Sequence, residues 1–432
     1  MSRQLRTHRR YYGWTIVGTL SLTETVSWGV LYYAFAVFLV PMHRELGWSN
    51  AQMTGAYSLA LLLSGLTAPL VGRWIDQRGS RVLMTGGSAL GVAQVLGWSQ
   101  VNTLWAFYLL WAGIGVAMAA TLYEPAFATV NLWFERDRAK AFLLVTLAAG
   151  FASTIFLPLA GTLVADLGWR QALIVLAAVL ACLALLPHAS LLRNRPEDLG
   201  QFPDGAIPDP ERPTPERVLE RSGTEPKAAL RDPAFRWLAV AFSLETFAST
   251  AVAVYLIAYL IDRGDGARFA AAVTGLIGAA QVAARILATV FGNRISQIGL
   301  TGLVFALQAV AVAVLLEWQS GIGVLVAVLL LGMGRGVVTL MRAGLVAEFY
   351  GRRHFGTING TLAFFLTGAR ALAPIAAGLA FALVDGYRTV FWALAMVSIL
   401  GAAAMVGVSR CRRFTDLSHI RTLSEQRGES TV

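Results

Sequence analysis

The loop GRWIDQRGSR, residues 72–81, joins two long apolar blocks at 50–74 and 81–100. An α-helix needs about 20 apolar residues to cross the hydrocarbon core of a membrane, so each block is long enough to span it. A short, charged loop between two such blocks predicts a pair of membrane helices. The pattern continues along the chain and predicts twelve spans, at 13–41, 50–74, 81–100, 103–134, 138–165, 169–190, 234–261, 268–294, 298–317, 321–349, 355–384 and 387–409.

The overall composition agrees with a chain that lies mostly in a lipid bilayer. Of the 432 residues, 56% are hydrophobic and 14% are charged, and the mean hydropathy is +0.61. Soluble domains carry about 25% charged residues, so a polytopic membrane protein is indicated. The net charge of +10 does not indicate nucleic-acid binding, because the basic residues form short clusters between apolar blocks and no continuous stripe.

A hydrophilic segment at about 191–232, rich in Pro, Glu, Asp and Arg, separates the sixth and seventh blocks. Such a segment cannot bury enough apolar surface to order itself, so we expect a linker loop without fixed structure. The predicted fold is an all-α membrane protein with twelve transmembrane helices in two six-helix halves. Its parts are an N-terminal half at 1–190, the linker at 191–232, a C-terminal half at 233–409 and a tail at 410–432.

Lys and Arg are distributed unevenly between the two sides of the predicted membrane. With the N-terminus inside, 26 of the 35 lie in cytoplasmic segments and five lie in the opposite loops. The positive-inside rule then places both termini and the linker in the cytoplasm. We expect a multi-pass protein of the plasma membrane, the bacterial inner membrane, and nothing in the sequence requires more than a monomer.

The two halves resemble each other in sequence. FERDRAKAF at 134–142 has a counterpart in YGRRHFGTI at 350–358, and DLGWR at 166–170 has one in VDGYR at 384–388. Matches in the same order, offset by about half the chain, indicate an internal duplication with parallel halves.

Four residues of the 72–81 loop match a known loop signature, roughly Gly-x-Leu-Ala-Asp-Arg-x-Gly-Arg-Arg: Gly72, Asp76, Gly79 and Arg81. With twelve spans, a long central loop and a repeat, the chain resembles the major facilitator superfamily. We expect Asp76 to face the positive N-terminus of a neighbouring helix. Arg81 would be its bidentate partner, and the loop would latch the cytoplasmic side in one state of the cycle. The alternative is a plain turn with solvated charges.

A finer resemblance rests on RYYGW near the N-terminus, FAVFLVPMHRELGWS at 35–49 and NRPEDLGQFPDG at 194–205. These stretches look like those of bacterial monocarboxylate and oxalate/formate porters. Monocarboxylate transporters have an Asp one turn before an Arg in the eighth span, and the Arg is implicated in binding the substrate carboxylate. Arg285 stands at the place of that Arg, whereas Gln281 stands at the place of the Asp.

Charged residues near the middle of the predicted spans are the candidate functional groups: Glu24, Glu124, Glu245, Arg285, Arg335 and Arg370. An arginine at the centre of a membrane helix costs about 2.5–3.5 kcal/mol on insertion scales, so such residues normally pair or face a polar cavity. One interpretation is three structural Glu–Arg pairs. The other is that an arginine binds an anion, which its fork of donors suits.

We assign substrate binding to Arg285, Arg335 and Arg370, with Tyr32 and Tyr123 lining the cavity. Proton coupling is assigned to Glu24, Glu124 and Glu245, because a carboxyl in a low-dielectric site exchanges protons near neutral pH. Arg342, two turns beyond Arg335 towards the cytoplasm, is expected to be a gate or a structural pair.

The sequence therefore predicts a secondary active transporter of a small organic anion, a monocarboxylate, coupled to protons and working by alternating access. The alternative is an efflux transporter of the same superfamily for a toxic compound such as an arsenical or a drug. An enzyme is not expected, since no nucleophile–base or metal-ligand constellation appears and Cys182 and Cys411 lie far apart. No cofactor or metal is expected, and the ATP-binding loop G-x-x-x-x-G-K-[ST] is absent from the sequence.

Overall fold

The computed structural model describes residues 11–205, 223–291, 296–384 and 386–429, and every regular element within these ranges is a helix. The chain forms two compact units. The first unit comprises residues 1–223 together with 351–360, and the second comprises 224–350 together with 361–432. The short segment 351–360 comes from the C-terminal part of the sequence but packs with the first unit.

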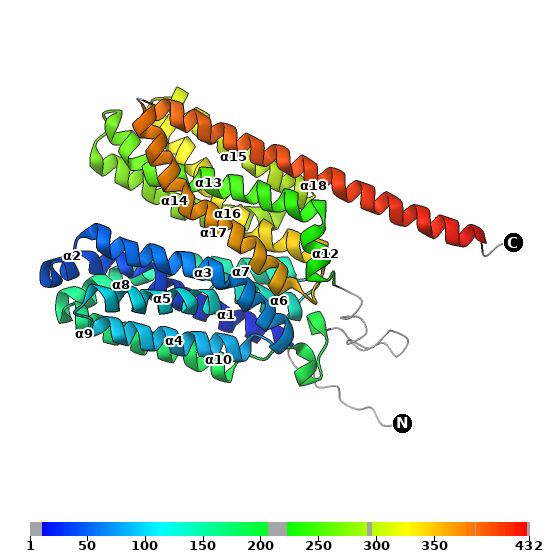
Figure 1. Cartoon of the computed structure of the whole chain (residues 1–432), viewed down its shortest axis with the longest axis horizontal. Coiled ribbons are helices and arrows are strands. Elements are labelled where there is room, and N and C mark those ends of the chain that lie inside the picture. The colour runs from blue at the N-terminus through cyan, green and yellow to red at the C-terminus, as the bar shows by residue number, and fades with distance from the viewer. Residues whose placement is uncertain (1–10, 206–222, 292–295, 385, 430–432) are drawn as a thin grey trace. The chain divides into compact units, whose positions relative to one another are not determined.

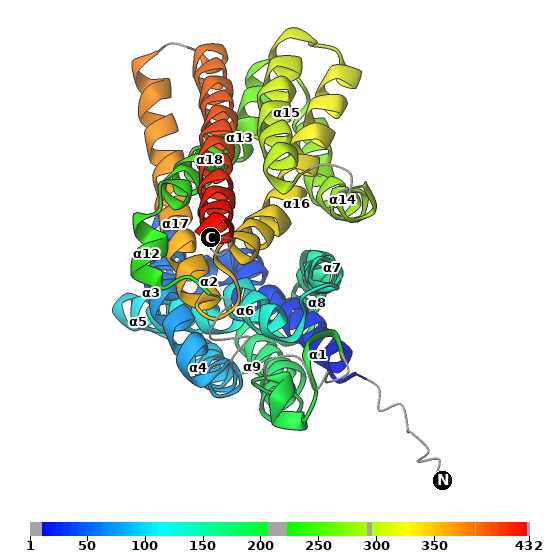
Figure 2. The same cartoon turned by 90° about the vertical axis from the view of Figure 1, so that its right-hand side faces the viewer.

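The first unit holds the helices of the N-terminal part of the chain (Figure 1). They are α1 (Gly13–Ser27), α2 (Phe35–Leu46), α3 (Asn50–Arg78), α4 (Arg81–Ser99), α5 (Leu104–Thr121), α6 (Tyr123–Trp133), α7 (Arg138–Gly150), α8 (Ala152–Leu167), α9 (Trp169–Leu180) and α10 (Leu186–Ser190). A π-helical turn at Trp28–Tyr33 joins α1 to α2, and another at Ala181–Leu185 joins α9 to α10. Helix α5 packs against α3 and α4, and α4 against α9 (Figure 2).

The second unit is a bundle in which α18 packs against α13 and α15, and α16 against α14 and α15. Its helices are α12 (Pro226–Arg231), α13 (Pro233–Asp262), α14 (Ala267–Phe291), α15 (Gln297–Glu317), α16 (Gly321–Tyr350), α17 (Phe355–Leu383) and α18 (Tyr387–Glu429). The first turn of α17 belongs to the segment 351–360 of the first unit.

The twelve predicted spans all correspond to helical stretches, which confirms the all-α membrane fold. Within the described ranges, ten stretches are long and apolar enough to cross a membrane, for example Gly13–Leu46 and Gly321–Tyr350. The other two expected spans are α4 and α14, the second with a shorter apolar section at Ala272–Leu287.

Local sequence explains where several helices begin and end. Ser49 and Gln52 form a capping box at the start of α3, and Asp232 caps α13, whose first residue is Pro233. Gly79 and Gly168 follow the ends of α3 and α8 at φ of +80° and +79°. Only glycine adopts such backbone angles without strain, so these helices stop where the sequence supplies it.

The linker departs from the expectation that all of it lacks fixed structure. Residues 206–222 lie outside the described residues, but residues 191–205 are ordered and contain short 3₁₀ helices at Pro196–Leu199 and Pro203–Gly205. Composition predicted disorder because the segment has little apolar surface. It is held instead by hydrogen bonds to the first unit, such as that from Arg81 N to Asn194 Oδ1 (3.0 Å).

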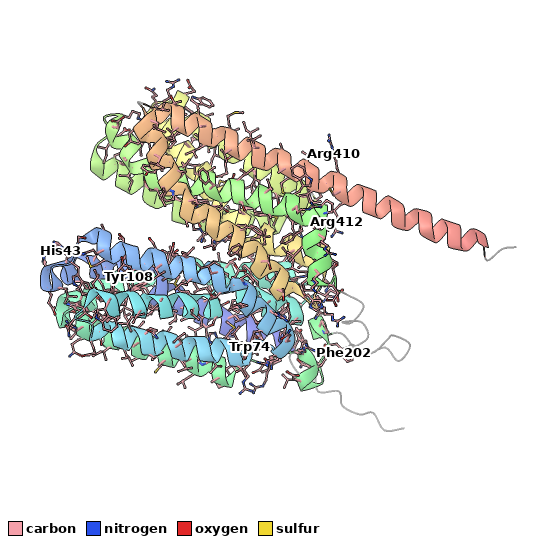
Figure 3. The ribbon with its side chains drawn as sticks, in the orientation of Figure 1. His43, Trp74, Tyr108, Phe202, Arg410 and Arg412 are labelled. Carbon is pink, nitrogen blue, oxygen red and sulfur yellow. The ribbon has the colours of Figure 1, made fainter. Side chains whose placement is uncertain are left out.

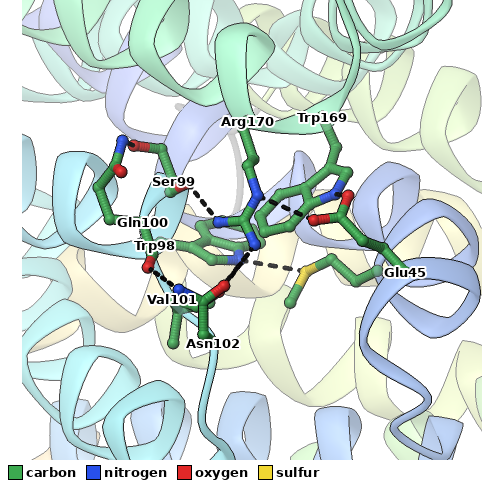
Figure 4. Close-up of polar contacts among 9 residues, drawn as sticks. Glu45, Trp98, Ser99, Gln100, Val101, Asn102, Trp169 and Arg170 are labelled. Atoms are coloured by element: carbon green, nitrogen blue, oxygen red, sulfur yellow. Dashed lines mark hydrogen bonds and ion pairs between the residues drawn. The ribbon is translucent and has the colours of Figure 1, made fainter.

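Figure 3 shows the two ends of the first unit: His43 and Tyr108 lie at one end, and Trp74 and Phe202 lie at the other. At the end marked by His43, Arg170 at the start of α9 connects three parts of the unit (Figure 4). Its guanidinium binds Glu45 at 2.9 Å, Ser99 O at 2.8 Å and Asn102 Oδ1 at 2.7 Å. These bonds tie the end of α2 and the α4–α5 loop to α9.

Replacing Arg170 with glutamine is expected to lower the stability of the folded protein by about 1–2 kcal/mol, because several charge-assisted hydrogen bonds are lost together. Thermal unfolding of the detergent-solubilised protein measures this. Arg136→Gln is the matched control, since the Arg136 side chain is 80% exposed. Equal melting temperatures for the two variants would show that the contacts of Arg170 contribute nothing.

Candidate functional site

Two of the predicted proton-coupling residues lie near each other inside the first unit. Glu24 is fully buried on α1, and its Oε2 accepts a hydrogen bond from Trp28 Nε1 at 3.0 Å. Within the described residues its other oxygen, Oε1, has no hydrogen-bond partner. Glu124, in the first turn of α6, is within electrostatic range of Glu24. Two carboxyl groups so close in a buried place repel each other when both are charged.

Aromatic side chains lie beside this acidic pair, on the side of Trp28. The ring of Trp28 lies 4.9 Å from that of Tyr32 and 5.0 Å from that of Tyr123, centroid to centroid. The structure therefore groups Tyr32 and Tyr123 with the acids. Trp28 is not among the residues predicted from the sequence, although a Trp four residues after a buried Glu lies on the same helix face.

Asn359 is a second residue of this group that is not predicted from the sequence. It is fully buried in the segment 351–360, and its Nδ2 donates a hydrogen bond to Glu124 Oε2. Asn359 lies far from Glu124 in sequence, so no pattern within one helix could have revealed the contact.

In the second unit, Arg285 lies buried on α14 with only 5% of its surface exposed. Its Nε donates to the carbonyl of Gly336 on α16, at 3.3 Å. The helices approach closely here: a Cβ at Gly336 would lie 2.3 Å from Gln281 O, and one at Gly332 would lie 2.7 Å from Ala280 Cβ. The glycines beside Arg335 therefore allow α14 and α16 to pack, as small residues do between membrane helices.

Glu245 and Arg335 form a second charged group in the same unit. Glu245 is 1% exposed on α13, accepts a hydrogen bond from Ser398 on α18, and is attracted electrostatically by Arg335 on α16. This attraction agrees with the interpretation that some intramembrane arginines pair with glutamates. Arg370 is exposed on α17, and Arg342 is 8% exposed on α16.

The loop signature positions Asp76 against the first turn of α17. Its Oδ1 accepts from Gly356 N at 2.9 Å, and its Oδ2 accepts from Thr357 N at 2.7 Å and from Thr357 Oγ1 at 2.6 Å. A carboxylate on the free N–H groups of a helix N-terminus is favourable. Gly72 makes this approach possible, since a Cβ there would lie 1.9 Å from Gly356 O.

Arg81 differs from its expected place as the bidentate partner of Asp76. Its Nε and Nη2 both donate to the carbonyl of Ala189, at 3.0 and 2.6 Å. The free carbonyls at the end of α10 attract a guanidinium, so Arg81 holds the start of the linker. Gly79 also touches this segment, because a Cβ there would lie 2.3 Å from the Asn194 side chain.

Residues 20–374 match the family model of the Major Facilitator Superfamily. The chain belongs to the Major Facilitator Superfamily. It is therefore a membrane transporter, as predicted from the loop 72–81 and the twelve spans, and members of this family are not enzymes.

Curated relatives in this superfamily are distant. The MFS transporter asaE of Aspergillus flavus is 23% identical over 367 residues, 84% of this chain and 78% of the relative. Human monocarboxylate transporter 14 is 30% identical over 178 residues, 39% of this chain and 34% of that protein. Rat monocarboxylate transporter 4 is 26% identical over 287 residues, 63% of this chain and 56% of that protein.

Solved structures of the superfamily share the fold. The human organic anion transporter MFSD10 has a TM-score of 0.69 at 17% identity and covers 91% of this chain and 99% of its own. The E. coli fucose:proton symporter FucP has a TM-score of 0.68 at 14% identity, and the match covers 93% of this chain and 99% of FucP. The candidate binding groups of the protein are the ionisable side chains in its membrane helices described above. Within the described residues, no three His, Cys, Asp or Glu side chains gather as metal ligands would.

Proposed function

We propose that the protein is a secondary active transporter of a small organic anion, a monocarboxylate, that moves with protons by alternating access. One observation carries the proposal: the guanidinium of Arg285 is buried in an apolar membrane helix beside the backbone of Gly336. Arginine stays charged when buried and meets a carboxylate with two parallel hydrogen bonds. The monocarboxylate transporters among its curated relatives support the same substrate class.

The acidic pair of the first unit supports proton coupling. Glu24 has one hydrogen-bonded and one unpartnered oxygen in a fully buried place, which suits a carboxyl that carries a proton. Glu124 stands beside it and is held by Asn359. A proton on either acid relieves the repulsion between them, so loading and release of a proton change the contacts of the site. Glu245, attracted by Arg335, is the third candidate.

The contact of Asp76 with the N-terminus of α17 serves as the predicted cytoplasmic latch. Gly72 is where the backbone of α3 lies against that helix end. Gly79 and Arg81 hold the linker beside it.

We place the protein in the plasma membrane, the bacterial inner membrane, with both termini in the cytoplasm, and as a monomer. The basic residues of the cytoplasmic segments support this orientation.

Replacing Asp76 with asparagine is expected to slow transport about tenfold, because the neutral amide loses the charge that the helix N-terminus attracts. The initial rate of uptake into proteoliposomes measures the effect. Gln77→Ala is the control, since Gln77 is exposed on the same turn. An unchanged rate in Asp76→Asn would mean that the contact is an ordinary helix cap.

Uptake in proteoliposomes tests the transport proposal itself. A radiolabelled monocarboxylate should accumulate when the lumen is alkaline relative to the outside, and the accumulation should collapse with a protonophore. Accumulation that needs the opposite gradient would support the efflux transporter instead. No uptake of any monocarboxylate under either gradient would contradict the substrate class.

A further inference from the structure

The ordered part of the linker binds the loop between α6 and α7. The Asp204 carboxylate accepts hydrogen bonds from the backbone N–H groups of Glu135, Arg136 and Asp137, at 3.0, 2.7 and 3.2 Å. Among the described residues other than glycine, Asp204 alone has a positive φ, +56°. A residue whose backbone is held in this sparsely populated conformation keeps it only when its surroundings fix it. The three hydrogen bonds provide that fixation.

Tyr11 and Tyr12, directly before α1, bind both the end of α6 and the linker. The hydroxyl of Tyr11 donates to Trp133 O and accepts from Asp204 N at 3.2 Å. Burial raises the pKa of Tyr11, so the hydroxyl keeps the proton that it donates. The backbone N–H of Tyr12 donates to Gln201 Oε1 at 3.0 Å. The end of α6 is thus enclosed by the linker on one side and by the N-terminal segment on another.

The enclosed end of α6 binds Arg352. This arginine is 8% exposed, and it donates through Nε to Asn131 O at 3.0 Å and through Nη2 to Leu132 O. These carbonyls belong to the last turn of α6, where the helix dipole favours a cation. Arg352 is therefore the counterpart of Asp76: one binds the C-terminus of α6, and the other binds the N-terminus of α17.

The charges around Arg352 come in part from the linker. Burial lowers the pKa of Arg352, whereas the acidic groups of Glu135, Glu197 and Asp204 favour its charged form. Glu135 Oε2 lies 3.9 Å from Arg352 Nη1, with its own side chain largely exposed. Glu197 and Asp204 both belong to the linker segment 191–205.

We infer that the linker is a working part of the cytoplasmic latch: Asp204 fixes the loop that carries Glu135 beside Arg352, and Glu197 adds negative charge to this anionic receptor for Arg352. Arg352 belongs to the segment 351–360, which continues at both ends into the second unit but packs with the first. The linker thus controls how firmly this segment is held. The inference rests on the proposed alternating access, in which such a segment is bound and released, and it gives Glu197, Asp204 and Arg352 the role of positioning residues.

Hydrogen exchange of the full-length protein in detergent, without substrate, tests the inference. Glu197→Gln and Asp204→Asn, singly and together, should raise amide exchange in peptides that cover 351–360 by about fivefold. Asp198→Asn is the matched control, because it removes the same charge from the same linker while Asp198, among the described residues, bonds locally to Arg195 N at 3.1 Å. Its exchange in 351–360 should equal that of the unsubstituted protein.

The Arg352→Gln background decides whether the effect passes through Arg352. Arg352→Gln alone should raise exchange in 351–360, and adding Glu197→Gln or Asp204→Asn should then change it no further. Two results would overturn the inference. One is that the linker substitutions raise amide exchange only in residues 135–137. The other is that they raise exchange in 351–360 by the same factor with Arg352 and with Gln at that position. If Asp204→Asn impairs folding, Glu197→Gln decides, because the Glu197 carboxylate caps no backbone group among the described residues. Raised exchange without any carboxylate transport would leave the inference intact and refute the proposed substrate.

Discussion

Replacing Arg285 with glutamine is expected to reduce transport at least about 100-fold, while the protein still inserts and folds. The loss of a buried, charge-assisted pair of hydrogen bonds to a carboxylate accounts for an effect of this size. Uptake into proteoliposomes measures it, with size-exclusion chromatography as the check on folding. Arg285→Lys should restore only part of the rate, since an ammonium keeps the charge but lacks the fork.

Arg410→Gln is the matched control for this substitution. Arg410 is exposed on α18 beyond its apolar part, towards the C-terminus (Figure 3), so the same chemical change there should leave transport unaltered. Retained transport in Arg285→Gln would remove Arg285 from the substrate site. The glutamates and Arg335 would then be the groups to test next.

Replacing Glu124 with glutamine is the substitution with the second largest expected effect. Glutamine keeps the hydrogen bond with Asn359 but can neither bind nor release a proton, and it removes the repulsion towards Glu24. We expect substrate exchange to continue while accumulation driven by a pH gradient falls about tenfold or more. The ratio of gradient-driven uptake to counterflow measures this.

Asp166→Asn serves as the control for Glu124→Gln, because Asp166 is an exposed acid at the end of α8. The ratio of gradient-driven uptake to counterflow in Asp166→Asn should match that of the unsubstituted protein. A pH profile that is the same with and without Glu124 would assign the proton to another acid, with Glu24 as the first to examine.

Hydropathy and the loop 72–81 were enough to predict the fold. Each apolar block became a helix because backbone groups in hydrocarbon must bond within their own segment. The resemblance of this loop to the superfamily signature led to the prediction that Asp76 meets a helix N-terminus. The apolar blocks depend on local sequence, whereas the helix that Asp76 meets begins about 280 residues further along the chain, so only the signature pointed to that contact.

The rest of the site depends on contacts between segments that are distant in sequence. Asn359 reaches Glu124, Arg352 reaches the end of α6, and Asp204 caps a loop about 70 residues before it. Composition misjudged residues 191–205, because it measures apolar surface and not the hydrogen bonds that a neighbouring loop offers. Arg81 was misplaced for a similar reason: its nearest partner, Ala189 O, is a backbone group that no side-chain pattern reveals.

Ligand-dependent thermal stability, with and without Arg285, tests the organic-anion proposal most directly. The purified protein would be heated with lactate, pyruvate, acetate, oxalate, arsenite and neutral analogues. A ligand at about 100 times its Kd adds ~2.7 kcal/mol if it binds only the folded state. We predict stabilisation by a monocarboxylate that disappears in Arg285→Gln and persists in Arg410→Gln. Stabilisation by no carboxylate, or equal stabilisation of the Arg285→Gln protein, would contradict a carboxylate site at Arg285.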